Sequence, residues 1–214
     1  MVRDEWNGTA VLDGLTATAV AGDRGALTEL LCRHDPLLRE RLRGRIGRRF
    51  RASFEEDDVC QVTYMEAFLR IRKFQPEGEG SFLAWLVSIA ENNIRDAVKA
   101  LERDRRPPPN RRVSNIVGDE SYECLFATLA GSHSTPSQRA SREETKTLLE
   151  RALTQLPPDY EKVVRLCDLQ GMSGPDAARA IGRSAGAVHM VKARAHERLA
   201  EILGESGKYF SRGS

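Results

Sequence analysis

The chain has 214 residues, of which 40% are hydrophobic and 30% are charged, and its formal net charge is +2. This composition is typical of a folded globular protein and excludes a disordered or fibrous chain. No apolar run reaches the roughly 20 residues that a membrane-spanning helix needs. Residues 1–20 lack the basic start and the apolar core of an export signal, so we expect a cytoplasmic protein that contacts no membrane.

The cysteines and histidines show no pattern of a metal or redox site. Cys32, Cys60, Cys124 and Cys167 are far apart and form no Cys-x-x-Cys pair. In a cytoplasmic chain this predicts reduced thiols. No histidine has the spacing of a zinc-binding helix. We therefore expect no metal and no cofactor.

The small net charge hides three segregated blocks. Residues 39–51, RERLRGRIGRRFR, hold seven arginines and one glutamate, whereas residues 55–58 are four consecutive acids. Residues 95–112 hold seven basic and three acidic residues. Such blocks predict polyanion contacts at some faces and a basic protein partner at another. The alternative is that each block is an ordinary solvated helix face.

The first half of the chain carries helical patterns. Leucines at three- and four-residue spacings predict helices within 27–46, the second of which starts at Pro36. Ser53 and Glu56 have the spacing of a capping box, which predicts a helix that begins there and runs to about Phe74.

A break then separates this helix from a longer one. QPEGEG at 75–80 ends the helical pattern, and Ser81 is suited to cap a helix over about 82–105. Three prolines at 107–109 end that helix. Residues 107–136 have no sustained period apart from a short turn in YECLFATLA, which predicts a flexible linker.

Helical patterns resume at about 137–155, 158–170, 174–181 and 184–203. The last two, joined by a turn at Gly182, have the pattern of a helix-turn-helix. No strand pattern competes, so the sequence predicts an all-α fold of two small helical domains joined by a flexible linker. The predicted organisation is an unpatterned segment at 1–20, a first domain at 21–106, a linker at 107–136, a second domain at 137–204 and a tail at 205–214.

The final helix of this pattern opens with small residues at 184–188, where side chains that contact bases would be expected. Its apolar stripe, which includes Val188, Val191 and Leu199, marks the side that faces the domain core. In helix-turn-helix proteins the N-terminal part of the other side enters the major groove. The alternative is a helical hairpin that binds nothing. The predicted edge consists of Gly186, Met190, Ala193 and Glu197, flanked by Ala187, His189 and Arg194.

The helix predicted over 82–105 offers a second nucleic-acid surface. One side repeats polar and basic residues every three or four positions, a stripe suited to following phosphates. Trp85 is available to stack on a base, although a single tryptophan on an apolar helix is more often part of a core. The stripe consists of Ser88, Asn92, Arg95, Lys99, Arg103 and Arg106.

Taken together, two stretches resemble the extracytoplasmic-function sigma factors, a two-domain group of the sigma-70 family of bacterial RNA polymerase initiation subunits. Residues 56–106, with EDDVCQ and FLAWL, resemble region 2, and residues 152–203, with LPP and DLQGMS, resemble region 4. The resemblance implies a protein that is not an enzyme. It would bind core RNA polymerase and direct promoter recognition and transcription initiation. An anti-sigma factor is a further candidate partner.

The resemblance also implies roles for individual residues. The segment 75–82 matches the loop that captures an unpaired base. The positions that match the family's polymerase-docking helix are Asp57, Asp58, Gln61, Val62 and Met65. Those that match the region for the downstream promoter element are Asn92, Asn93, Arg95, Lys99 and Arg103. Those expected to contact the upstream element are Ser184, Ala187, His189, Met190 and Arg194.

The sequence departs from the family pattern in the helix expected to contact the upstream element. Many relatives carry Lys and Arg near the positions of His189 and Val191. In a sigma factor, a helix that makes few base contacts suffices, because the polymerase holds it at high effective concentration relative to the DNA. The alternative function is a stand-alone helix-turn-helix transcriptional regulator, which would need neither the acidic block nor the basic stripe. A hydrolase that uses the acids with His34 is disfavoured, because carboxylates at a helix start usually form a cap and a solvated face.

Overall fold

The computed structural model describes residues 12, 14–105, 119–130 and 142–205. Throughout this part of the chain every regular element is helical, so the predicted all-α class is confirmed. The chain divides into two compact units, 1–98 and 99–214, and the division falls inside one long helix. None of the described helices combines the length and apolarity needed to span a membrane.

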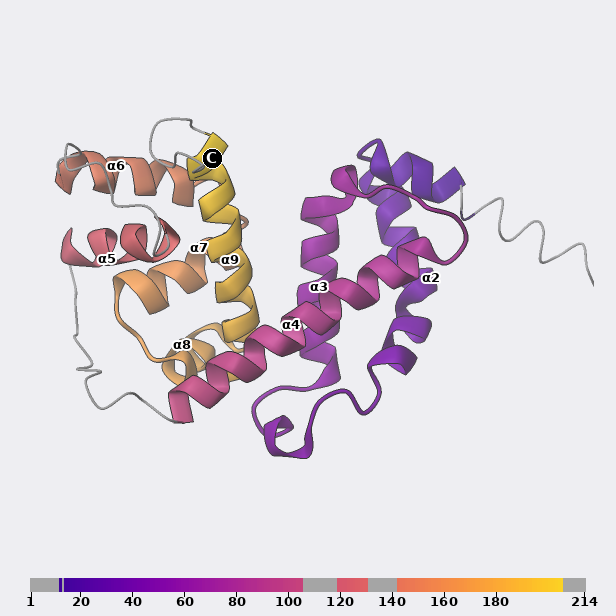
Figure 1. The fold of residues 1–214 in the computed structure, drawn as a ribbon, viewed down its shortest axis with the longest axis horizontal. Coiled ribbons are helices and arrows are strands. Elements are labelled where there is room, and N and C mark those ends of the chain that lie inside the picture. Colours follow the sequence, from indigo (N-terminus) through magenta and orange to yellow (C-terminus); the bar gives the residue numbers. More distant parts are fainter. Residues whose placement is uncertain (1–11, 13, 106–118, 131–141, 206–214) are drawn as a thin grey trace, which may run out of the picture. The chain divides into compact units, whose positions relative to one another are not determined.

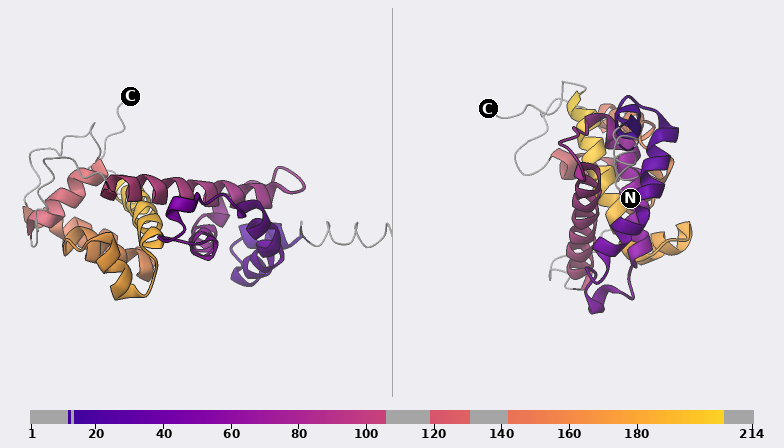
Figure 2. Two further views of the ribbon diagram at one scale, coloured as in Figure 1. Left: turned by 90° about the horizontal axis from the view of Figure 1, so that it is seen from below. Right: turned by 90° about the vertical axis from the view of Figure 1, so that its right-hand side faces the viewer.

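The first unit consists of a helical segment at 14–20, α2 (Arg24–Leu42), α3 (Glu56–Arg70) and α4 (Ser81–Arg105), the last of which continues into the second unit (Figure 1). In both views of Figure 2, α4 is a long, straight helix. Its apolar side and the buried sides of α2 and α3 form the core of the unit. The buried side chains include Leu27, Leu30, Leu38, Leu42, Val59, Val62, Phe82, Leu86 and Ala97.

Two predicted helix starts are wrong. Pro36 does not begin a helix, because α2 runs through it as one helix with buried leucines on both sides. The cap of α3 is not the predicted Ser53–Glu56 pair: its N-cap is Glu55, whose N–H donates to Asp58 Oδ2 at 2.9 Å. In a run of four acids several capping registers are available from sequence alone, and the buried side of α3 selects between them.

The second unit contains α5 (Asp119–Ala130), α6 (Arg142–Leu153), α7 (Pro158–Val164), α8 (Gly174–Ile181) and α9 (Ala185–Glu205). A π-helical turn at Arg165–Leu169 extends α7. α9 contacts the other four helices, and in Figure 1 it runs along one side of the unit. The core of the second unit includes Leu149, Leu153, Tyr160, Val163, Val188, Val191, Leu199 and Leu203.

The linker predicted over 107–136 contains a packed helix. α5 contacts α6 and α9, and its Leu125 and Phe126 are only 2% and 5% exposed. The sequence pattern was too short and too interrupted to predict more than a turn, and tertiary burial stabilises the helix. The rest of the predicted linker, 107–118 and 131–136, lies outside the described residues.

Because α5 is part of the second unit's core, we expect Phe126→Ala to destabilise that unit by about 3 kcal/mol through loss of buried apolar surface. Urea unfolding of the full chain, followed by circular dichroism, measures the change. The neighbouring Cys124 is exposed, and Cys124→Ala is the matched control, with little expected effect. Equal, negligible effects of both substitutions would mean that α5 is an unpacked linker segment.

Candidate protein and nucleic-acid interfaces

The acidic first turn of α3 is fastened to its own unit. Asp58 completes the capping box with Glu55, and Asp57 forms an ion pair with Arg39 of α2. Glu56 Oε1 accepts a hydrogen bond from the Gly44 N–H at 3.2 Å. The Asp57 side chain remains 75% exposed, so this turn still presents negative charge at the surface.

A polar network joins α2 to α3 behind this turn. The Tyr64 hydroxyl donates to Asp35, which also pairs with Arg39 at 2.8 Å. Burial and the hydrogen bond to Asp35 raise the pKa of Tyr64 well above its ordinary value, so the phenol stays protonated. Burial alone would raise the pKa of Asp35, but hydrogen bonds from Tyr64 and Arg39 outweigh it and lower that pKa. The network holds the outer face of α3 in a fixed orientation.

The two faces of α3 divide the predicted polymerase-docking residues. Gln61 is exposed and Met65 is half-buried, so both are accessible. Val62 is fully buried and contributes to the core of the unit, which removes it as a surface contact. Phe68 and Leu69 extend the accessible face and are 37% and 41% exposed, respectively. Sequence reasoning did not include these two, although they lie seven and eight residues after Gln61, on the same helical face.

Four of the five residues predicted to contact the downstream promoter element form one accessible stripe on α4. Asn92 is half-buried, whereas Arg95, Lys99 and Arg103 are exposed. Among the described residues, neither Arg95 nor Lys99 has a carboxylate partner. Exposed, unpaired cations at helical spacing are suited to contacts with phosphates. Arg106 lies outside the described residues.

Asn93 does not belong to this stripe. It is fully buried, and its side-chain nitrogen donates to Thr63 Oγ1 of α3 at 3.3 Å. A buried amide requires hydrogen-bond partners, and Thr63 supplies one. The prediction that Asn93 contacts DNA is therefore replaced by a structural role in joining α4 to α3.

Trp85 is part of an aromatic cluster at the start of α4. Its ring lies 4.9 Å from that of Phe74 and 5.7 Å from that of Phe82, measured between centroids. The adjacent residues 75–80 are exposed. The cluster therefore anchors both ends of the loop that the family resemblance assigns to base capture.

Two serines and a glycine cap the helices of the helix-turn-helix, α8 and α9. Ser173 Oγ accepts from the Asp176 N–H at 3.2 Å and caps α8. Gly182 ends α8 with a φ of +69°, a left-handed conformation that favours glycine. Ser184 Oγ accepts from the Ala187 N–H at 3.1 Å, so the hydroxyl of this predicted DNA-contacting residue is engaged at the start of α9.

The predicted reading edge of α9 is largely inaccessible in the structure. Ala187 and Met190 are fully buried, and Arg194 is 5% exposed and pairs with Glu197 at 2.5 Å. Helical projection placed these residues outward, but α9 packs against helices on several sides. Gly186 of the first turn is also buried, whereas Ser184, Ala185 and Ala193 are half-exposed and Glu197 is exposed.

His189 lies inside the helix-turn-helix. A Cβ at Gly174 would come within 2.9 Å of His189 Cε1, which shows how closely the ring packs against the start of α8. Burial lowers the pKa of His189, so the ring is neutral at neutral pH. The neutral ring therefore adds no positive charge to this part of α9.

Asp168 fastens α9 to the π-helical turn that precedes α8. Its two carboxylate oxygens lie 2.7 Å from Lys192 Nζ and 2.8 Å from His196 Nε2. Burial alone would raise the pKa of Asp168, but the hydrogen bonds and charges of His196 and Lys192 outweigh it and lower that pKa. Sequence reasoning missed this cluster, because its members are 24 and 28 residues apart.

Comparison with known proteins decides the family. The sigma-70 region 2 model matches residues 33–104, and the sigma-70 region 4 model matches residues 146–204. The ECF RNA polymerase sigma factor SigD of Mycobacterium tuberculosis is 31% identical over 198 residues, which cover 92% of this chain and 86% of SigD. This chain belongs to the ECF sigma factors of the sigma-70 family. It is thus an RNA polymerase sigma factor that directs promoter recognition.

Other sigma factors share this likeness over most of their length. CarQ of Myxococcus xanthus is 29% identical, with 86% of this chain and 92% of CarQ covered. Among solved structures, the sigma factor RpoE in complex with the anti-sigma factor NepR from Bartonella quintana is 22% identical. That likeness covers 85% of this chain and 98% of the RpoE chain, with a TM-score of 0.27.

The Asp168 cluster predicts a pH-dependent contribution to stability. Asp168→Asn should destabilise the second unit by about 2 kcal/mol, because Lys192 and His196 lose a largely buried anionic partner. The folded pKa lies below the unfolded value of about 3.9, so the contribution is complete above that value. It is lost as the pH falls through the folded pKa. Urea unfolding of both proteins at a series of pH values from about 3 to about 7 checks this.

The matched control for this experiment is Glu201→Gln, which removes an exposed carboxylate that pairs with Arg198 on the same helix. Its effect should stay below about 0.5 kcal/mol. The free energies of unfolding of wild type and Asp168→Asn should converge under acid conditions. If they did not, the stabilisation could not be assigned to the Asp168 carboxylate.

Proposed function

We propose that the outer face of α3 docks on core RNA polymerase, and that α4 and the start of α9 contact promoter DNA. The observation that carries this proposal is the unpaired cationic stripe of α4, within a chain that matches sigma regions 2 and 4. The two domains would thus correspond to about 21–106 and to 137–204 together with α5, which packs in the core of the second unit. The protein would act as a non-enzymatic initiation factor in the cytoplasm, where the polymerase works.

The docking proposal is supported by the chemistry of the α3 surface. Gln61, Met65, Phe68 and Leu69 form an accessible face with a large apolar component. Directly before it, Asp57 and the capping carboxylates present negative charge. An apolar centre bordered by charge is typical of a protein interface, and the acidic border favours a basic partner surface. The same face gives an anti-sigma factor a surface to cover, as a competitor of the polymerase.

We expect Gln61→Ala with Leu69→Ala to weaken binding to core polymerase by about tenfold or more, since central interface residues dominate affinity. Both side chains are exposed, so the fold should remain intact. Fluorescence anisotropy of a labelled chain titrated with core polymerase measures the affinity. Thr28→Ala with Glu29→Ala, on an exposed part of α2, is the control and should bind like wild type.

Titrations of promoter duplex with and without core polymerase distinguish a sigma factor from a stand-alone transcriptional regulator. A sigma factor binds promoter duplex specifically only when core polymerase is present, whereas a stand-alone regulator binds it unaided. Specific duplex binding by the free chain, together with unchanged polymerase affinity in the α3 variant, would favour the regulator.

The promoter proposal assigns different tasks to the α4 residues. Arg95 and Lys99 are exposed, flexible cations suited to phosphates, whereas the amide of Asn92 can donate to and accept from a base. At the upstream element, the start of α9 offers the small, half-exposed side chains of Ser184 and Ala185. These permit close approach to DNA, with groove shape contributing to specificity. Met190 and Arg194 would support this helix rather than read bases.

The tasks on α4 predict two kinds of defect. Lys99→Ala should weaken promoter binding by a similar factor on all sequences, because it removes a phosphate contact. Asn92→Ala should relax preference at one base position of the downstream element. Abortive transcription on duplex and pre-melted templates with single base changes measures both. If Asn92→Ala lowered activity equally on every template, its assignment as a base reader would be wrong.

A further inference from the structure

An arginine-rich segment between α2 and α3 is not used by any of the roles above. It begins near the end of α2 and reaches the residues before α3. Every arginine in it is exposed. The set comprises Arg41, Arg43, Arg45, Arg48, Arg49 and Arg51, referred to below as the arginine loop.

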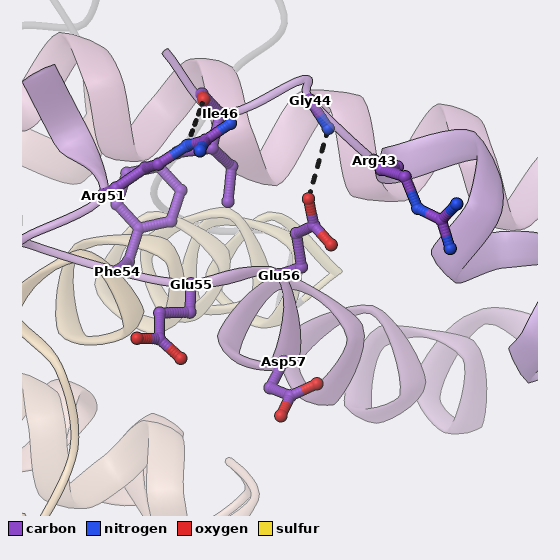
Figure 3. Close-up of a pocket in the computed structure, with 8 residues that line it drawn as sticks. All are labelled: Arg43, Gly44, Ile46, Arg51, Phe54, Glu55, Glu56 and Asp57. Atoms are coloured by element: carbon purple, nitrogen blue, oxygen red, sulfur yellow. Dashed lines mark hydrogen bonds between the residues drawn. The ribbon is translucent and has the colours of Figure 1, made fainter. Parts of the chain in front are cut away.

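The nearby acids do not neutralise the whole loop. Asp57 pairs with Arg39, outside the set, and Glu56 accepts from the backbone of Gly44. Asp58 completes the cap of α3. In Figure 3 the Glu56 carboxylate reaches toward Gly44, whereas the Arg43 side chain extends away from it. The acidic block therefore serves the start of α3 and leaves much of the loop's charge in place.

The arginines themselves fall into two groups. Arg45 pairs with Glu91, and Arg51 Nε donates to the Ile46 carbonyl at 3.4 Å. Arg49 lies over the Phe50 ring at 4.5 Å. By contrast, among the described residues no carboxylate pairs with the remaining three. These are Arg41, Arg43 and Arg48.

The loop is held in place by buried side chains. Ile46, Phe50 and Phe54 alternate with the exposed arginines and are each no more than 3% exposed. A 3₁₀ turn at Arg48–Phe50 adds local order. The guanidinium groups thus project from a backbone that is already positioned, which reduces the entropy lost when they bind a ligand.

One ion pair places the loop beside the promoter-facing side of α4. Arg45 Nη1 lies 3.5 Å from Glu91 Oε1. Glu91 immediately precedes Asn92 and lies four residues before Arg95, on the same side of the helix as Arg95. Arg45 therefore lies next to the part of the α4 stripe that belongs to the first unit, which holds Asn92 and Arg95.

We propose that the arginine loop binds backbone phosphates of duplex promoter DNA and extends the contact surface of α4. Arginine presents a planar fork of donors that matches phosphate oxygens. Three guanidinium groups without a carboxylate partner, on a loop whose Arg45 contacts α4 one residue before Asn92, favour DNA over an acidic protein segment. The contact contributes affinity without reading sequence. This inference rests on the proposed function of α4, since the polymerase complex must first bring DNA to the first unit.

The test compares two double variants in the complete polymerase complex. Arg43→Gln with Arg48→Gln removes two unpaired loop cations. Arg24→Gln with Arg33→Gln removes two exposed cations from the first half of α2. Arg24 lies about 28 Å from Arg43, because α2 rises about 1.5 Å per residue. Promoter affinity is measured as a function of salt concentration, and the affinity of each variant for core polymerase is measured in parallel.

We expect the loop variant to reduce the slope of log affinity against log salt by about 1.8, since each phosphate contact contributes about 0.9. Between about 50 and 200 mM salt, its loss of affinity should be about tenfold smaller than that of wild type. Changes of single promoter bases should leave this difference unaltered, and the control variant should keep the wild-type slope.

Three results would overturn the inference: an unchanged slope in the loop variant, an equal reduction in the control, or a loss confined to polymerase binding. The last would assign the loop to a protein surface. Failure of the underlying function looks different. In that case the wild-type chain would itself form no promoter complex with core polymerase, whatever the behaviour of the variants.

Discussion

The burial of one side of α3 against α2 and α4 determines what the first unit can offer to a partner. Val59, Val62 and Ala67 are fully enclosed, so the residues on the other side of the helix must face outward. The network of Asp35, Tyr64 and Arg39 adds directional contacts to this apolar packing. A helix that could rotate about its axis would offer no constant surface. Here the buried side and the polar network together fix which residues are presented.

The charged blocks of this chain serve the fold first and its partners second. The acids before α3 cap the helix, receive the Gly44 N–H and pair with Arg39, yet their charge remains at the surface. The arginine loop shows the complementary case, because buried Ile46 and Phe50 hold its backbone while its charged groups project outward. Net charge alone would suggest no polyanion partner. It is the separation of charges along the chain, preserved in the fold, that produces surfaces of opposite sign.

The sequence predicted helix existence and class well, because amphipathic periodicity reports burial directly. It also predicted the turn at Gly182, which depends on local chemistry. Helix starts among repeated acids and the packed α5 were missed, since both are decided by tertiary contacts. The site residues show the same limit. Asn93 and Val62 lie within two helices whose outer faces are accessible, but a family position does not reveal which side of the helix is buried.

The second unit shows why the helix proposed to contact the upstream element can carry few side chains suited to base contacts. α9 is the central packing element of its unit, so most of its length is committed to the core. Its tie to Asp168 and the close packing of His189 against Gly174 fix its angle relative to α8. Under the proposed function, only the start of this helix would approach a groove, and its small residues would avoid collisions with DNA. Such a unit would discriminate weakly by itself. If the polymerase complex also binds DNA through the first unit, as proposed, α9 would need to supply only a modest difference in free energy, because the effective concentration of the promoter would already be high.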